Sequence, residues 1–189
     1  MKREISDRTI LGEFTEDFCE IVEKHCKYFI CSGFSAIASG RSRGTEDIDM
    51  IIEKLNPQKF IKLHNALVKA GFECIQSHEA LEIFNYLDEN LSIRYVKKGE
   101  YLPEMELHFS KDILDEIQLK ERIKMPFTKL DIYFAPLEGN IAFKEDWLKS
   151  DKDMEDAKHL RIVYQGEFDE ERINKFKRLI KEVRLKNAR

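Results

Sequence analysis

The sequence lacks several features that would place it in a specialised class of protein. It has no apolar run long enough to span a bilayer, and its basic N-terminus, MKREISDRT, is not followed by an apolar core. We therefore expect neither a membrane span nor a signal peptide. Its four cysteines form no Cys-x-x-Cys pair, which favours free thiols in a reducing cytosol over a zinc or disulfide framework. Internal repeats and low-complexity linkers are absent too.

The bulk composition indicates a globular cytoplasmic protein. The chain has 189 residues, 42% of them hydrophobic and 36% charged, which is enough for one domain with a real core. A formal net charge of −4 argues against a protein that coats nucleic acid along its whole surface.

One stretch, residues 28–53, carries most of the functional signal. It reads YFICSGFSAIASGRSRGTEDIDMIIE. A short apolar run ends at Ser32-Gly33, a small-residue segment ends at Gly40, a polar loop follows, and a second apolar run begins at Asp47. This order predicts a strand, a short helix, a loop and a second strand.

Two carboxylates in this stretch indicate a metal site. Residues two apart in a strand point to the same face, so Asp47 and Asp49 would lie side by side while Ile48 and Met50 face the core. Paired carboxylates repel unless a cation lies between them, and magnesium commonly takes one or two of them together with substrate phosphates. A glycine at a strand-to-helix turn lets a phosphate approach the backbone, which favours Ser32-Gly33 as the phosphate-binding turn. Asp-x-Asp alone is also typical of a solvated strand end.

The combination resembles the nucleotidyltransferase fold of the DNA polymerase beta superfamily. It is most similar to the small prokaryotic branch, which includes minimal nucleotidyltransferases and toxins of abortive-infection systems. That branch reads as an apolar strand, Gly-Gly or Gly-Ser, a small-residue helix, Gly, then Arg-x-Thr-x-Asp-x-Asp. Here Ser32-Gly33 fills the glycine pair, with serine as a departure at the first position, and the other matches are Arg43, Thr45, Asp47 and Asp49.

The resemblance implies a third carboxylate on a neighbouring strand, and the sequence offers two strands for it. One strand, 103–109, alternates cleanly and carries Glu106 with Glu104 beside it. The other, 128–134, carries Asp131. Periodicity does not separate the two, and we favour Glu106. Arg94, in a further expected strand, either reaches the triphosphate or forms a surface ion pair.

The remaining pattern predicts alternating helices and strands. We expect helices over 6–27, from Pro57 to Gly71, over 110–123 with Ser110 as the cap, and in three stretches after Pro136. We expect strands over 72–76, 103–109 and 128–134, and a hairpin formed by 83–87 and 91–96. The tail carries Lys144 and Lys152-Asp153-Met154-Glu155-Asp156-Ala157, similar to the tail motif of the resembled family. The last helix is rich in Lys and Arg, which suits either a solvated helix end or contact with RNA or an acidic partner.

The sequence thus predicts an α/β protein with a mixed sheet: a nucleotidyltransferase-like core over residues 1–135 and a helical segment over 136–189. The resemblance implies transfer of a nucleoside monophosphate from a triphosphate, expected to be ATP, to a hydroxyl of a protein, an RNA or a small molecule. Asp47, Asp49 and Glu106 would hold Mg²⁺ or Mn²⁺. Ser32 and Gly33 would bind the triphosphate, Arg43 would offset its charge, and Thr45 would position the loop. The alternative is a catalytically weak, antitoxin-like binding or regulatory module of the same fold.

Overall fold

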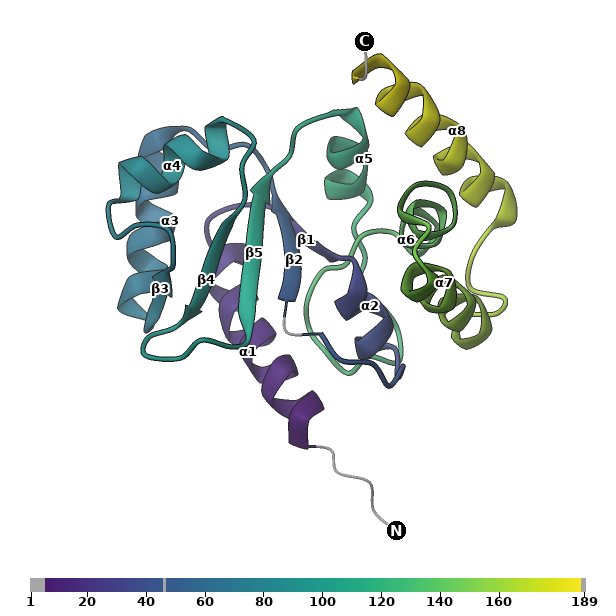
Figure 1. Ribbon diagram of the computed structural model, residues 1–189, viewed down its shortest axis with the longest axis horizontal. Helices are drawn as coiled ribbons and strands as arrows, with labels where there is room; N and C mark the ends of the chain where they lie inside the picture. The colour runs from purple at the N-terminus through teal and green to yellow at the C-terminus, as the bar shows by residue number, and fades with distance from the viewer. Residues whose placement is uncertain (1–5, 46, 188–189) are drawn as a thin grey trace.

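The structure, a computed structural model, describes residues 6–187 apart from residue 46. Its centre is a five-stranded sheet in the order β1-β2-β5-β4-β3 (Figure 1). The strands are β1 (Tyr28–Cys31), β2 (Asp47–Ile52), β3 (Phe72–Cys74), β4 (Ile93–Lys97) and β5 (Glu104–Phe109). Only β2 and β5 pair in parallel, and the other three pairs are antiparallel. The sheet is therefore mixed, as the sequence predicts.

Three helices cover one face of this sheet. They are α1 (Ser6–Glu23), α3 (Pro57–Lys69) and α4 (Ala80–Asp88). Aromatic side chains join them to the strands: Phe18 of α1 contacts Tyr95 of β4 with ring centroids 5.6 Å apart, and Phe60 of α3 contacts Phe109 of β5 at 6.1 Å. The buried side chains Ile48 and Met50 of β2 belong to this core. Because side chains alternate along a strand, Asp47 and Asp49 are left on the opposite face.

The other helices gather beside β1 and on that opposite face (Figure 1). They are α2 (Gly33–Ala38), α5 (Ile113–Glu121), α6 (Leu137–Phe143), α7 (Asp151–Val163) and α8 (Glu170–Asn187), and the π-helical turn η1 (Lys144–Leu148) continues α6. Leu119 of α5 packs on Phe29 of β1. Buried residues of α7 and α8, such as Leu160 and Ile173, belong to the same hydrophobic core as the sheet. The C-terminal helices are thus packed on the sheet, and the boundary at residue 135 stays a prediction.

Two of the predicted strands are wrong. Residues 83–87 lie within helix α4, so the hairpin with 91–96 does not exist, although its second half forms β4. The apolar run IFNYL is short enough to suit either state, and here the helix buries Ile83, Phe84 and Leu87 against the core. Residues 128–134 form no strand either. Phe134 makes isolated bridges to Ile30 and Ile123, so this segment only touches the edge of the sheet.

The helix boundaries largely follow the predicted signals. Asn56 caps α3 by accepting a hydrogen bond from the Lys59 backbone N–H, and Ser150 caps α7 in a capping box with Asp153. The cap of α5 was assigned to the wrong residue: Asp112, not Ser110, accepts the backbone N–H groups of Leu114 and Asp115. Within the described part of the chain, no helix is both long and apolar enough to cross a membrane.

Candidate functional site

Two pairs of carboxylates face each other across the parallel strands β2 and β5. Asp47 lies opposite Glu104, and Asp49 lies opposite Glu106. Parallel pairing brings residues of matching alternation to the same face, so all four acidic side chains leave the sheet on the side away from α1, α3 and α4. The register therefore places the Glu106 strand, rather than the segment with Asp131, beside the Asp-x-Asp pair.

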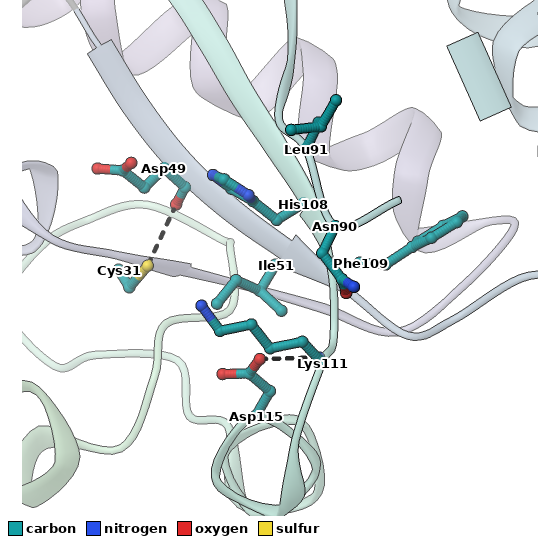
Figure 2. Close-up of a pocket in the computed structure, with 9 residues that line it drawn as sticks. All are labelled: Cys31, Asp49, Ile51, Asn90, Leu91, His108, Phe109, Lys111 and Asp115. Carbon is teal, nitrogen blue, oxygen red and sulfur yellow. Dashed lines mark hydrogen bonds between the residues drawn. The ribbon is translucent and has the colours of Figure 1, made fainter. Parts of the chain in front are cut away.

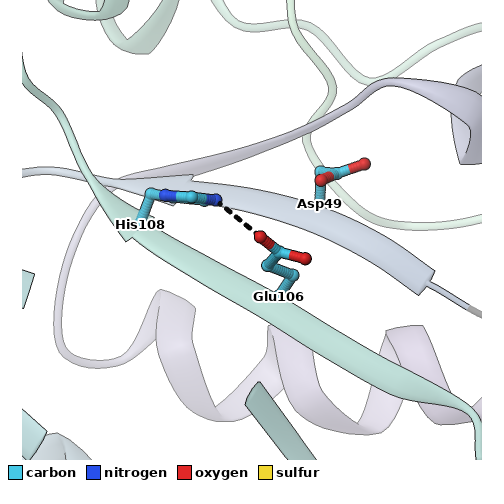
Figure 3. Close-up of side chains that lie close together, drawn as sticks. All are labelled: Asp49, Glu106 and His108. Atoms are coloured by element: carbon cyan, nitrogen blue, oxygen red, sulfur yellow. Dashed lines mark ion pairs between the residues drawn. The ribbon is translucent and has the colours of Figure 1, made fainter. Parts of the chain in front are cut away.

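A histidine joins this group of acids. Ligand atoms of Asp49, Glu106 and His108 all lie within 4.8 Å of one another, and the His108 Nε2 is 3.3 Å from the Glu106 Oε1 (Figure 3). His108 was missed in the sequence. It lies two residues after Glu106 on the same strand, so the alternation that selected Glu106 also places the imidazole on that face.

Arg94 compensates the charge of the two glutamates. Its guanidinium is 3.0 Å from Glu104 and 3.2 Å from Glu106, because Arg94 of β4 lies opposite Glu106 of β5. Burial alone would raise the pKa of Glu106, but hydrogen bonds with Ser92 and Arg94 outweigh it and hold that pKa below the ordinary value. Glu106 is therefore ionised at neutral pH. Of the two roles open to Arg94 in the sequence, the structure shows the ion pair.

Asp49 is in a different electrostatic environment. Its pKa is raised, chiefly by burial and further by the negative charge of Glu106, while a hydrogen bond with Ser32 opposes the shift. The pKa of Glu104 is also raised, again mainly by burial, against the pull of Arg94. A cation beside such a partly buried carboxylate stabilises its charged form and lowers its pKa.

The Ser32–Gly33 turn joins β1 to α2 beside this group. Ser32 has φ 59° and ψ −140°, a backbone conformation that glycine adopts freely and that strains other residues. Such strain costs on the order of 1–3 kcal/mol and tends to occur at functional sites. The serine that departs from the family's glycine thus occupies a position whose geometry suits glycine. The turn is close to the acids, since Ser32 hydrogen bonds with Asp49.

Arg43 belongs to a buried ionic cluster. Arg41 and Arg43 both form ion pairs with Asp156 of α7, and Lys144 approaches the same carboxylate at 2.9 Å. Asp156 has no exposed side-chain surface, and the Lys144 side chain is 1% exposed. Burial lowers the pKa of Lys144, and the charge of Asp153 partly restores it. Residues of the tail motif therefore fix the conformation of the polar loop after α2.

The two remaining predicted residues are Thr45 and Asp131. The Thr45 hydroxyl donates a hydrogen bond to the Asp47 carbonyl at 3.1 Å, which ties the loop to the start of β2. Asp131 lies on the surface with 84% of its side chain exposed, and it forms an ion pair with Lys124. It is not part of the group formed by Asp49, Glu106 and His108.

Two cavities lie beside Asp49, His108 and the Ser32–Gly33 turn. A smaller one of about 190 Å³ contains Asp49 and His108 and extends to Asn90 and Leu91 (Figure 2). A larger one of about 330 Å³ contains Ser32 and extends between α5 and the α6–η1 segment to Trp147. Cys31, Ile51, His108, Lys111 and Asp115 line both cavities. The two cavities therefore adjoin each other, and Asp49 lies in the wall of the smaller one.

The donor set fits a divalent cation. Two carboxylate oxygens and one imidazole nitrogen can converge on one ion, with the remaining positions left for water or phosphate oxygens. Carboxylate oxygens and water suit magnesium and manganese, whereas imidazole is a typical ligand of zinc, iron and other later transition metals. The residues present thus fit the metal that the resemblance implies, with a nitrogen ligand in addition.

The mixed five-stranded sheet and the C-terminal helices form a nucleotidyltransferase-like fold. A solved structure similar to this chain is the solution structure of the antibiotic-resistance factor ANT(2'')-Ia. It is 11% identical to this chain, the match covers 95% of this chain and 96% of that one, and the TM-score is 0.56. No family model matches the chain, and no curated protein matches it. At this identity the likeness establishes the fold.

Three basic side chains in the described part of the last helix pair with acids within the molecule. Arg172 forms an ion pair with Glu121 of α5, Lys177 with Glu145, and Lys181 with Asp146 of the η1 turn. Much of the basic character of α8 therefore balances acids on neighbouring helices. This arrangement supports the solvated, intramolecular interpretation of α8 over a dedicated RNA surface.

Proposed function

We propose that this protein is a metal-dependent nucleotidyltransferase that moves a nucleoside monophosphate from a nucleoside triphosphate to a hydroxyl acceptor. The observation that carries the proposal is the register of β2 and β5. It brings Asp49 and Glu106 together on the open face of the sheet, next to the strained Ser32–Gly33 turn. The resemblance of the sequence to the abortive-infection branch supports a toxin-like role, with a protein, an RNA or a small molecule as the acceptor.

Each group in the cleft has a role in this proposal. Asp47, Asp49 and Glu106 would hold the divalent ion, with His108 as a further ligand. When bound, such an ion acts as a Lewis acid that offsets the charge of the transferred phosphoryl group. The backbone of the Ser32–Gly33 turn would hold the triphosphate, and Lys144, whose amine pairs with the buried Asp156, would hold α7 beside the same cavity. Arg94 keeps Glu106 ionised and oriented.

This proposal gives Arg43 a different role from the one that the sequence suggests. The sequence suggests that it offsets the charge of the triphosphate directly. In the structure its guanidinium pairs with the buried Asp156. We therefore assign Arg43 the role of holding the polar loop against α7. From this position Arg43 also supports the Ser32–Gly33 turn.

A second candidate function is supported by the same ion pairs. Arg94 already balances Glu104 and Glu106, so two of the four strand acids have a cationic partner without any ligand. A nucleotidyltransferase-like protein with such internal compensation can serve as a nucleotide-binding or regulatory module with little turnover, in the manner of an antitoxin.

A transfer assay distinguishes the two functions. The protein is incubated with each α-labelled triphosphate and Mg²⁺ or Mn²⁺, with protein, RNA and small-molecule fractions of a cell extract as acceptors. Label on an acceptor that disappears in Asp49→Asn supports the enzyme. Saturable nucleotide binding with no labelled product in any fraction supports the binding module. Absence of both binding and transfer refutes the proposed function.

A further inference from the structure

The larger cavity has an aromatic wall that the phosphate and metal chemistry does not use. Its floor is the open face of the sheet, formed by Phe29 and Ile51, and the opposite wall is formed by Phe143, Trp147 and Leu148 of the α6–η1 segment. The volume of about 330 Å³ lies near the lower end of the range for small-molecule sites. We call this space the Trp147 cavity.

The π-helical turn shapes this wall. In η1 the Lys149 backbone N–H bonds to the Lys144 carbonyl at 3.1 Å, five residues back, and Lys149 then ends the turn with φ 57°. Such wide turns are rare and occur often at functional sites. Here the turn points Lys144 into the buried ionic cluster while Trp147 and Leu148 lie at the edge of the cavity, 48% and 47% exposed.

The Trp147 cavity is continuous with the phosphate-binding turn. Ser32 and Lys144 line it, and so does His108, the neighbour of Glu106. A triphosphate held at Ser32–Gly33 with its α-phosphate near Asp49 would therefore have its nucleoside at the entrance of this cavity. The smaller cavity contains Asp49 and lacks Ser32, so it does not adjoin the phosphate-binding turn in the same way.

The chemistry of the cavity suits a planar aromatic ligand with polar edges. Trp147 and Phe143 offer aromatic surface, and stacking on such side chains holds any nucleobase. Gln118, whose side chain is buried, contributes an amide with both donor and acceptor groups. Asn140 is less available, because its amide already donates a hydrogen bond to the Ala135 carbonyl.

We propose that the Trp147 cavity binds the nucleobase of the nucleoside triphosphate, with Trp147 as the stacking surface. This inference rests on the proposed function, since it assigns a place to the base of the same substrate. It also assigns base recognition to the helical C-terminal segment, whereas the phosphates are held by the β1–α2 turn.

The sole tryptophan of the chain makes this proposal directly measurable. We expect Mg²⁺–ATP to quench the intrinsic fluorescence of Trp147 in a saturable way. Mg²⁺–tripolyphosphate, which has no base, should bind by calorimetry without comparable quenching. Comparing ATP, GTP, CTP and UTP in the same titration then ranks the bases.

Variants separate stacking from phosphate binding. Trp147→Ala should weaken triphosphate binding by roughly tenfold or more and leave tripolyphosphate binding unchanged, while Trp147→Phe should keep most of the affinity. Phe127→Ala is the matched control, because Phe127 is a 71% exposed aromatic residue that lines neither cavity. Circular dichroism and thermal unfolding confirm that each variant is folded.

The outcomes are distinct. Equal quenching by ATP and tripolyphosphate, or unchanged ATP affinity in Trp147→Ala, overturns the assignment of the cavity while the proposed function stands. If neither ligand binds the wild-type protein, the proposed function fails and this inference fails with it. If Trp147→Ala does not fold, the comparison of ATP with tripolyphosphate in the wild-type protein still decides the matter.

Discussion

The guanidinium of Arg43 lies directly against Gly33. A Cβ atom built on this glycine would be 3.1 Å from the guanidinium carbon and from both of its terminal nitrogens. The arginine has little freedom to retreat, because it forms an ion pair with the fully buried Asp156 of α7. A side chain at position 33 would therefore have to displace Arg43, which is held in place by Asp156 of α7.

This contact gives a prediction for Gly33. We expect Gly33→Ala to displace Arg43 slightly and to weaken triphosphate binding by several-fold. Gly33→Val adds β-branched bulk and should weaken binding further. Calorimetric titration with Mg²⁺–ATP measures the effect, and thermal unfolding checks the fold. Gly44→Ala is the control, since a Cβ on Gly44 meets nothing within 4 Å in the same loop. Normal ATP binding by Gly33→Val would remove the turn from the site.

The two strand candidates for the third carboxylate give a second prediction. Glu106→Gln should reduce nucleotidyl transfer by about 10²-fold or more, because it removes a charge that lies beside Asp49. Asp131→Asn should retain most of the activity, because Asp131 is a surface residue paired with Lys124. Initial rates of transfer at saturating metal measure both. The reverse result, with Asp131→Asn inactive and Glu106→Gln active, would contradict the assignment.

A third prediction concerns the choice of metal. If His108 supplies a nitrogen ligand, the wild-type protein should bind Mn²⁺ more tightly than Mg²⁺. His108→Ala should reduce Mn²⁺ affinity by roughly tenfold and affect Mg²⁺ less. Electron paramagnetic resonance of free Mn²⁺ and competition with Mg²⁺ give both constants without an activity assay. His25→Ala, a surface change far along the chain from the site, controls for loss of any imidazole. Equal losses for the two ions would exclude His108 as a selective ligand.

Asp49 gives a fourth prediction, which concerns stability. Burial raises its pKa above the ordinary 3.8, so the folded protein disfavours the charged form. The resulting penalty is absent below pH 3.8, grows as the pH rises towards the raised pKa, and is complete above it. Without metal, Asp49→Asn should therefore unfold about 1–3 °C higher than the wild-type protein at pH 7–8.

Thermal unfolding in a chelator from pH 4 to pH 8 measures this difference, which should shrink as the solution becomes more acidic. Asp131→Asn, at an exposed position, should show no such gain. Added Mn²⁺ should stabilise the wild-type protein and not Asp49→Asn, because only the wild-type protein keeps the full ligand set. A variant that is less stable than the wild-type protein across this range would contradict the prediction.

Local patterns were sufficient to predict the centre of the fold. Alternation over Asp47–Ile52 and over Glu104–Phe109 identified β2 and β5, and Asn56-Pro57 marked the start of α3. Alternation could not show which strands pair, so the choice between Glu106 and Asp131 needed the register of β2 with β5. The helical state of residues 83–87 was equally inaccessible, because a five-residue apolar run has no distinguishing period.

The contacts of the polar loop were beyond sequence reasoning for a different reason. Arg43 matches the motif of a phosphate-binding cation, and its partner Asp156 matches a tail motif, yet nothing local indicates that the two meet. His108 could have been found, since it follows Glu106 at the strand period. The π-helical turn at Lys144–Leu148 has no sequence signal that we recognise, although it positions Trp147.

The ionic cluster around Asp156 also limits how the chain can be divided. Arg41, Arg43 and Lys144 share this one buried carboxylate. A fragment ending near residue 135 would keep both arginines and lose their partner, so the loop that leads into β2 would carry two uncompensated cations next to the Ser32–Gly33 turn. We expect such a fragment to retain the sheet and to hold the loop poorly. An experimenter who seeks a minimal folded unit should therefore keep α7, and α8 with it, because Ile173 of α8 is buried in the same hydrophobic core as the sheet.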